Sequence, residues 1–223
     1  MPIATRDFPM KLHFALLALA LFPALAFSEP AKDAEKPATP VVAKATKVRL
    51  KTNKGDIVLE LNAEKAPITV ENFLGYVDKK HYDGTVFHRV IDGFMIQGGG
   101  FALTDGKLVE KTSGKGIKNE GQNGLKNVRG SIAMARTNDP NSATAQFFIN
   151  VSDNAALDYP SNGGYAVFGK VIEGMDIVDK IKVTPTGVSK LTMLHPVTGE
   201  KLEMPSQDVP KEPVVIVSAT VEK

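Results

Sequence analysis

The sequence predicts a mainly β fold in which strands outnumber helices. From residue 47 onward, short segments alternate apolar and polar side chains, which is typical of half-buried strands. Turn signals such as Asn53-Lys54-Gly55 and Asp92-Gly93 separate these segments. The strands, about seven or eight in number, do not alternate with helices. This pattern favours an antiparallel sheet or a closed barrel with helical caps over parallel βαβ units.

The first elements of the predicted domain are a hairpin and a helix. Residues 47–61 alternate apolar and charged side chains on both sides of the turn at residues 53–55, as in a β-hairpin. Pro67 is suited to the first turn of a helix, because it lacks the N–H that a helix start leaves unpaired. The apolar residues that follow it have helical spacing and are Val70, Phe73, Leu74 and Val77.

The rest of the chain continues the strand pattern, with one more helix. Further strands are predicted at residues 127–136, 146–151, 165–172 and 213–221, and a short helix at residues 175–181. Residues 101–125 are rich in Gly and Lys and are predicted to be mostly loop. Residues 184–212 are polar apart from two small apolar clusters, and their pattern predicts no role.

Composition and charge exclude several classes of function. The net charge is +2 without a long basic run, so there is no electrostatic footprint for nucleic acid. The absence of Cys excludes disulfides, thiolate catalysis and Cys-ligated metals. His13, His81, His88 and His195 do not have the spacing of metal ligands. We therefore expect neither a metal nor a cofactor, and no nucleic-acid partner.

The N-terminal residues have the pattern of an export signal. Lys11 precedes an apolar run at residues 14–22, and Ala24-Leu25-Ala26 fits a cleavage site for small residues. The run is short for a membrane span, which needs about 20 apolar residues, although an uncleaved anchor is the alternative. We therefore predict a signal peptide at residues 1–26, a flexible Ala/Pro/Lys linker at 27–45 and a domain at 46–223. The signal predicts an exported protein.

Residues 87–100 combine a cation, two large apolar side chains and a carboxamide: Arg89, Phe94, Met95 and Gln97. Such a set can build a shallow apolar pocket with a strong donor at its edge. For Arg89 alone, an ion pair beneath the helix is the alternative. Neighbouring residues of a strand face opposite sides, so His88 is predicted to point away from the pocket as a structural histidine.

Several long motifs resemble the signature of cyclophilin-type peptidyl-prolyl isomerases. They are FHRVIDGFMIQGG at 87–99, SIAMAR at 131–136, NSATAQFFI at 141–149, Leu157-Asp158, and GYAVFGKV at 164–171. With the segments at 67–72 and 213–221, the resemblance covers roughly residues 47–222. Together with the signal peptide, it implies an exported bacterial member of the family, located in the periplasm. It implies an eight-stranded antiparallel closed barrel capped by two α-helices, with the substrate in a groove on the outer surface.

The resemblance also implies roles for individual residues. Arg89 matches the catalytic arginine, and Gln97 and Gln146 match the polar groups that hold the substrate backbone and orient that arginine. The walls of the proline pocket match Phe94, Met95, Phe148, Leu157 and Tyr165, where Tyr165 replaces a common histidine. Ala135 and Arg136 match the segment whose main chain pairs with the peptide. Ala156 replaces the tryptophan of cyclosporin-sensitive members, so we expect weak or no cyclosporin binding.

The function implied is catalysis of X–Pro bond rotation in exported polypeptides, which assists their folding. The expected partners are unfolded or proline-containing polypeptides, and the expected state is a monomer. The alternative is a chaperone that binds proline peptides and isomerises them incidentally. A hydrolase using His88 is disfavoured, because neither a nucleophile nor a supporting acid can be placed beside it.

Overall fold

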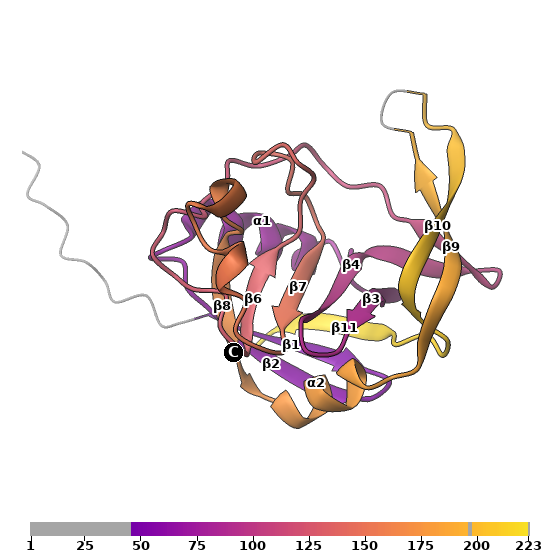
Figure 1. Ribbon diagram of the computed structural model, residues 1–223, viewed down its shortest axis with the longest axis horizontal. Helices are drawn as coiled ribbons and strands as arrows, with labels where there is room; N and C mark the ends of the chain where they lie inside the picture. Colours follow the sequence, from indigo (N-terminus) through magenta and orange to yellow (C-terminus); the bar gives the residue numbers. More distant parts are fainter. Residues whose placement is uncertain (1–45, 196–197, 223) are drawn as a thin grey trace, which may run out of the picture. The chain divides into compact units, whose positions relative to one another are not determined.

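The computed structural model of the protein describes residues 46–195 and 198–222. The predicted signal peptide at 1–26 and the predicted linker at 27–45 lie outside these residues. Within them the chain forms eleven strands, two α-helices and two short 3₁₀ helices (Figure 1). The strands are β1 (Lys47–Thr52), β2 (Gly55–Leu61), β3 (Thr85–Ile91), β4 (Met95–Thr104), β5 (Lys107–Glu110), β6 (Ser131–Met134), β7 (Phe147–Asn150), β8 (Val167–Glu173), β9 (Thr186–Leu194), β10 (Lys201–Pro210) and β11 (Ile216–Val221). The helices are α1 (Pro67–Asp78), α2 (Met175–Lys182), η1 (Ala155–Leu157) and η2 (Ser161–Gly163).

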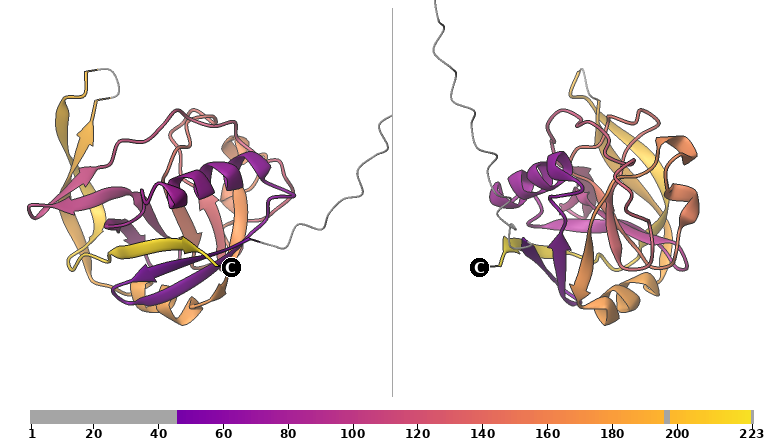
Figure 2. Two further views of the ribbon diagram at one scale, coloured as in Figure 1. Left: turned by 180° about the vertical axis from the view of Figure 1, so that it is seen from behind. Right: turned by 90° about the vertical axis from the view of Figure 1, so that its left-hand side faces the viewer.

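One sheet contains all the strands. Its order is β10-β9-β5-β4-β7-β6-β8-β2-β1-β11, and β3 pairs with β4 beside this path. The pairs are antiparallel except β5 with β9, which run parallel. The helices α1 and α2 lie on opposite sides of the strands, as all three views show (Figures 1 and 2). The mainly β class with two helices is therefore as predicted.

The structure differs from the expected eight-stranded closed barrel in strand number and in closure. Within the described part of the chain, Val86 of β3 meets Val215, the residue before β11, at an isolated bridge and not through a ladder. The backbone of Val215 is engaged elsewhere, because its N–H donates to Asn53 Oδ1 (3.0 Å) and its carbonyl accepts from the Asn53 N–H (3.0 Å). Beside the bridge, the Val214 carbonyl accepts from the Phe87 N–H (2.9 Å) and the Ile216 carbonyl accepts from the Gly84 N–H (2.8 Å). These bonds do not form a ladder, so a closed barrel is not shown.

The additional strands come from segments whose pattern is not strand-like. β4 runs on to Thr104 and pairs with β5, in the stretch that was predicted to be loop. β9 and β10 form a long hairpin from residues 184–212, which projects beside β3 and β4 (Figure 1). The strand predicted at 127–136 begins only at Ser131, because the Ser131 N–H bonds to the Val128 carbonyl (3.0 Å) in a turn that includes Gly130 with φ of 84°.

Helix α1 follows the predicted pattern and buries Thr69, Val70, Phe73 and Val77. Its first turn is capped from a distant loop, where Glu120 accepts from the N–H groups of Ile68 (3.1 Å) and Thr69 (2.8 Å). A carboxylate stabilises a helix start because it satisfies unpaired N–H groups and complements the helix dipole. Phe73 packs in the core against Tyr82, Phe147 and Phe168, with ring centroids 5.0, 5.7 and 5.1 Å away.

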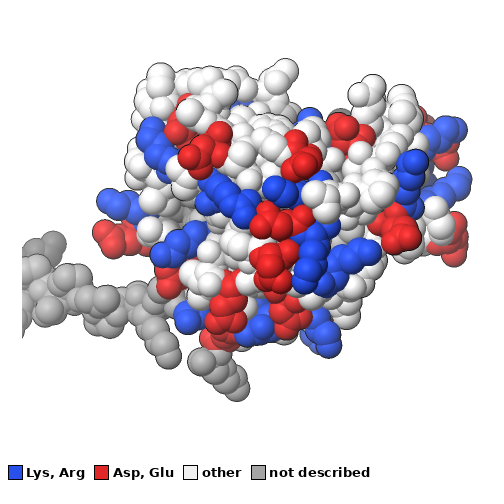
Figure 3. Space-filling model, turned by 60° about the horizontal axis from the view of Figure 1, so that its bottom comes forward, with Lys and Arg blue, Asp and Glu red and all other residues white. Residues whose placement is uncertain are grey.

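The charged surface has both signs interspersed on the face shown in Figure 3. Around α2, Arg129 pairs with Asp179 (2.8 Å) and Lys182 lies 3.5 Å from the same carboxylate. Such exposed pairs each contribute little to stability, with a median of about 0–1 kcal/mol. Among the described helices, none has the length and apolar character that a membrane span requires.

Candidate active site

Strand register brings the predicted site residues onto one face of the sheet. Arg89 of β3 is opposite Gln97 of β4, and Gln97 is opposite Phe148 of β7. Directly paired residues in antiparallel strands point to the same side, so these three side chains form a row. Phe148 continues the row to Ala133 of β6. The pleat thus lines up a cation, an amide and an aromatic ring over three adjacent strands.

These side chains form a small pocket of about 120 Å³. Its lining contains every predicted site residue except Gln146, namely Arg89, Phe94, Met95, Gln97, Ala135, Arg136, Phe148, Leu157 and Tyr165. Met95 and Phe148 are buried and form its floor, while Phe94, Leu157 and Tyr165 are half-buried at the rim. Residues that lie between positions 89 and 165 of the sequence therefore enclose one pocket with an apolar floor.

Tyr165 closes the pocket with support from two sides. Its ring packs edge-on against Phe148, with centroids 5.8 Å apart. The guanidinium of Arg136 lies over the face of the Tyr165 ring, 4.3 Å from the ring centroid. That guanidinium also donates to the carbonyls of Thr137 (2.9 Å) and Gly164 (3.1 Å). Arg136 thus stiffens the rim through its side chain, in addition to the main-chain role that the resemblance implies.

Gln146 lies just outside the small pocket and is coupled to it. Its Oε1 accepts a hydrogen bond of 3.0 Å from Gln97 Nε2. Its side chain crosses Gly100, where a β-carbon would come within 2.4 Å of Gln146 Cγ. The third glycine of the Gly98-Gly99-Gly100 run is therefore required for space, so that Gln146 can reach Gln97.

Replacing Gly100 by alanine is expected to lower kcat/KM about fivefold, because Gln146 must move and lose its hydrogen bond to Gln97, worth roughly 1 kcal/mol. A peptide isomerisation assay measures the change. Gly75→Ala is the matched control, since nothing lies within 4 Å of its added methyl group in α1. Full activity of Gly100→Ala would show that the position of Gln146 is unimportant.

Arg89 is half-buried on the wall of the pocket. Within residues 46–195 and 198–222 its guanidinium makes no ion pair and no hydrogen bond, so the alternative of an ion pair beneath the helix is not observed. Its donors are available to a ligand in the pocket. An arginine keeps its charge at any physiological pH and presents rigidly oriented N–H groups.

His88 does not line the pocket, as predicted, although a bulge of β3 between Phe87 and Arg89 breaks the strict alternation on which that prediction rested. It is 4% exposed, and its ring centroid lies 4.7 Å from that of Phe101. Burial lowers the pKa of His88 to about 4, so the ring is neutral near pH 7. His88 is a structural residue of the sheet and does not reach the pocket.

Sequence reasoning missed the polar contacts behind the rim. Asp158 Oδ1 accepts from the backbone N–H (2.8 Å) and the side-chain amide (3.1 Å) of Asn127. The adjoining residue Leu157 accepts at its carbonyl from the Tyr165 N–H (2.9 Å). These bonds hold Leu157 and Tyr165 against each other. Asn127 and Asp158 are 31 residues apart, and nothing in their local patterns pairs them.

A second, larger cavity of about 800 Å³ adjoins the small pocket. The two share Gln97, Ala135 and Arg136 as lining. The larger cavity is bounded by Gln146, by residues 110–114 after β5, and by the end of β9 at Met193 and Leu194. Among the described residues, no three His, Asp or Glu side chains gather as a metal site would require.

A shallow apolar pocket with an unengaged guanidinium on its wall and a pair of amides at its edge is a site that can bind a peptide. The family model for cyclophilin-type peptidyl-prolyl cis-trans isomerases matches residues 47–221. The chain belongs to this family, and it is a peptidyl-prolyl cis-trans isomerase.

Individual relatives agree with this assignment. The chain is 54% identical over 178 residues to the peptidyl-prolyl cis-trans isomerase cyp18 of Streptomyces antibioticus, which covers 78% of this chain and 97% of the relative. It is 51% identical over 178 residues to peptidyl-prolyl cis-trans isomerase B of Escherichia coli K12, and the match covers 78% of this chain and 98% of the relative. A Cryptosporidium parvum cyclophilin-type isomerase, crystallised in the presence of the dipeptide Ala-Pro, is similar in structure with a TM-score of 0.62. That match has 28% identity and covers 79% of this chain and 99% of the other.

Proposed function

We propose that this isomerase acts on exported polypeptides and assists their folding, with Arg89 as its catalytic donor. The observation that supports this role is the position of Arg89 in the wall of the pocket. Its guanidinium makes no hydrogen bond and no ion pair with the residues that the structure describes. The pocket accepts the proline ring against Met95 and Phe148. The peptide flanking the proline runs over Ala135 and Arg136, whose main chain lies at the rim.

Catalysis of this reaction requires no nucleophile. The barrier to rotation about an X–Pro bond, about 18–20 kcal/mol, comes from amide resonance. As the bond twists, the lone pair of the prolyl nitrogen becomes localised. A guanidinium N–H aimed at that nitrogen stabilises the twisted state more than the planar ground state, and only such a difference accelerates the reaction. Gln97 and Gln146 hold the substrate backbone so that the nitrogen meets the donor.

The test is exchange spectroscopy on a tetrapeptide with one X–Pro bond, followed by refolding of a protein limited by proline isomerisation. We expect the purified protein to accelerate both. Acceleration of the tetrapeptide without an effect on refolding would contradict a role in folding.

Export is supported by the sequence pattern of residues 1–26 and is tested separately. We express the full-length chain in a Gram-negative cell and expect to recover it from the periplasm. Its mass should be that of a chain whose first residue is Phe27. A chain of full mass in the cytoplasm would contradict the proposal. Deletion of residues 2–26 serves as the control that cannot be exported.

A second candidate function is a chaperone that binds proline peptides and isomerises them incidentally. Exposed apolar side chains on the β9–β10 hairpin favour it, since Val188, Leu202 and Met204 are 75%, 45% and 50% exposed. If Arg89→Ala suppresses aggregation of a proline-free client as well as the original protein does, this function exists beside catalysis.

Cyclosporin is expected to inhibit the protein weakly, because the exposed Ala156 of η1 offers neither a ring nor an N–H donor. Ala156→Trp should lower the inhibitory concentration at least about tenfold, since a tryptophan adds a large apolar surface and an indole donor. Inhibition of the isomerisation assay measures this. Ala156→Leu is the control for added apolar surface without the donor, and equal inhibition of all three proteins would contradict the prediction.

A further inference from the structure

The larger cavity is bounded on its outer side by the β9–β10 hairpin. Met193 and Leu194 of β9 face Gln97, Ala135 and Arg136 across it, and these last three residues also line the proline pocket. A ligand can therefore occupy both spaces without leaving the surface. The cavity volume of about 800 Å³ compares with about 120 Å³ for the proline pocket, so most of the continuous space lies beyond the proline.

The hairpin is an integral part of the sheet. Leu191 and Val209 are buried in a small core with Val86, Phe101 and Leu108. β9 also pairs in parallel with β5. At the cavity, the Leu194 N–H donates to Glu110 Oε2 (2.9 Å). These contacts hold the β9–β10 hairpin in place at the cavity. The hairpin therefore presents a preformed surface to a ligand and does not need to rearrange when the ligand binds.

The charged side chains at the cavity are engaged with the main chain. Lys111 Nζ donates to the carbonyls of His81 and Asp83, and Glu110 accepts from Leu194. Arg136 donates to neighbouring carbonyls, as described above. Hydroxyls of Ser113 and Thr144 also face the space. A lining of engaged charges, hydroxyls and apolar side chains suits a polypeptide of mixed polarity better than an ionic ligand.

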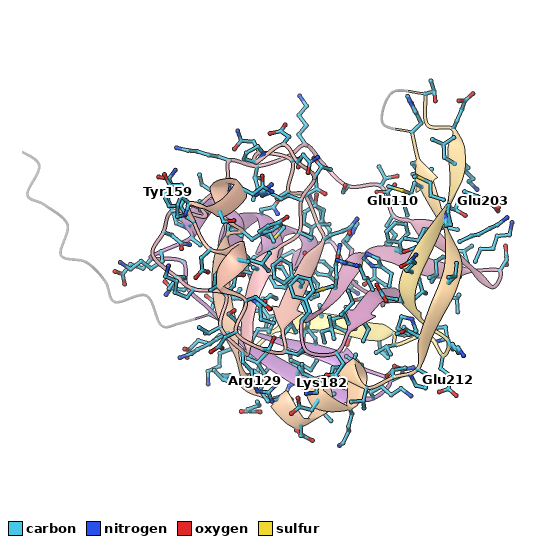
Figure 4. All side chains as sticks on the ribbon, in the orientation of Figure 1. Glu110, Arg129, Tyr159, Lys182, Glu203 and Glu212 are labelled. Atoms are coloured by element: carbon cyan, nitrogen blue, oxygen red, sulfur yellow. The ribbon has the colours of Figure 1, made fainter. Side chains whose placement is uncertain are left out.

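An apolar surface continues from the cavity along the hairpin. Leu202 pairs with Met193 and Met204 with Leu191, so all four side chains share one face. Leu202 and Met204 are 45% and 50% exposed. Charge is confined to the other face, where Glu203 binds Lys107 (3.2 Å) and Lys190 (3.0 Å). Figure 4 shows Glu110 and Glu203 on opposite sides of the hairpin.

The geometry points to the β9–β10 hairpin as a second recognition surface for the client polypeptide. While the proline ring occupies the small pocket, the residues flanking it enter the larger cavity and contact Met193, Leu194 and Leu202 with apolar side chains. The inference rests on the proposed function of the pocket. It implies that long unfolded segments with apolar residues beside the proline are bound more tightly than short proline peptides.

Methionine methyl groups provide direct reporters. In protein labelled with ¹³C at the methionine methyls, a tetrapeptide with one X–Pro bond should shift the resonance of Met95 alone. Peptides extended by four apolar residues before or after the proline should be compared with it. At least one extension should also shift Met193 and Met204, and Met175 in α2 is the internal control that stays unchanged. If both extended peptides shift only Met95, the inference is overturned.

Kinetics provides an independent test. The ratio of kcat/KM for the effective long peptide to that for the tetrapeptide should fall about tenfold in Met193→Ser/Leu202→Ser, through the loss of apolar contact. Val217→Ser in β11 is the matched control, because this valine is 48% exposed and lies outside both the hairpin and the cavity lining. An unchanged ratio in the double variant contradicts the inference. If the unmodified protein fails to accelerate even the tetrapeptide, the proposed function itself fails, so the two failures are distinguishable.

Discussion

Replacing Arg89 by alanine is expected to lower kcat/KM for an X–Pro tetrapeptide by about 10²–10³-fold, the loss typical for removal of one donor to a developing charge. The pocket floor of Met95 and Phe148 remains, so the proline ring is still bound. What is lost is a donor that acts mainly on the twisted state, and the fall should therefore be in kcat more than in KM. Exchange spectroscopy at several peptide concentrations separates the two constants.

Two further variants make this result specific. Arg89→Lys keeps the charge but loses the planar set of donors, and it should recover only part of the activity. Arg129→Ala removes an exposed arginine that is paired with Asp179 near α2, away from the pocket, and it should leave kcat/KM unchanged. A near-normal kcat/KM of Arg89→Ala would contradict a catalytic role of Arg89. The pocket would then serve only to bind the substrate.

Part of the site could be predicted from the sequence because the geometry of that part is local. Arg89 and Gln97 belong to two strands joined by the Asp92-Gly93 turn, and their direct pairing places them on one face, whereas alternation does not predict the bulge at His88. The walls at Phe148, Leu157 and Tyr165 required the family resemblance, since periodicity does not tell which aromatic residues meet.

The parts that escaped prediction depend on contacts between distant residues. The β9–β10 hairpin carries only two small apolar clusters without a clear strand pattern, and it is stabilised where Leu191 and Val209 meet Val86 and Phe101 of β3 and β4. Its parallel pairing with β5 leaves no signal in either segment. Glu120 capping α1 is likewise visible only in three dimensions. Strand count and closure could not be predicted for the same reason.

His88 predicts how stability depends on pH. Burial lowers its pKa from 6.5 to about 4, so in the folded protein it remains neutral where the unfolded chain binds a proton. The unfolded state is then favoured as the pH falls, and stability is lost between about pH 6.5 and 4. Because one pKa unit corresponds to about 1.4 kcal/mol, the loss is of the order of 3 kcal/mol. Chemical denaturation at a series of pH values measures it.

The slope of unfolding free energy against pH distinguishes His88 from other groups. His88→Gln leaves a neutral side chain, so the slope between pH 4 and 6.5 should become much smaller whatever the variant costs in stability at pH 7. A residual slope of the same sign is expected from His81, whose pKa is lowered by burial and by the charge of Lys111. If His88→Gln keeps the full slope, the buried imidazole is not its cause. Because His88 does not line the pocket, loss of activity in acid should follow unfolding and not titration of the site.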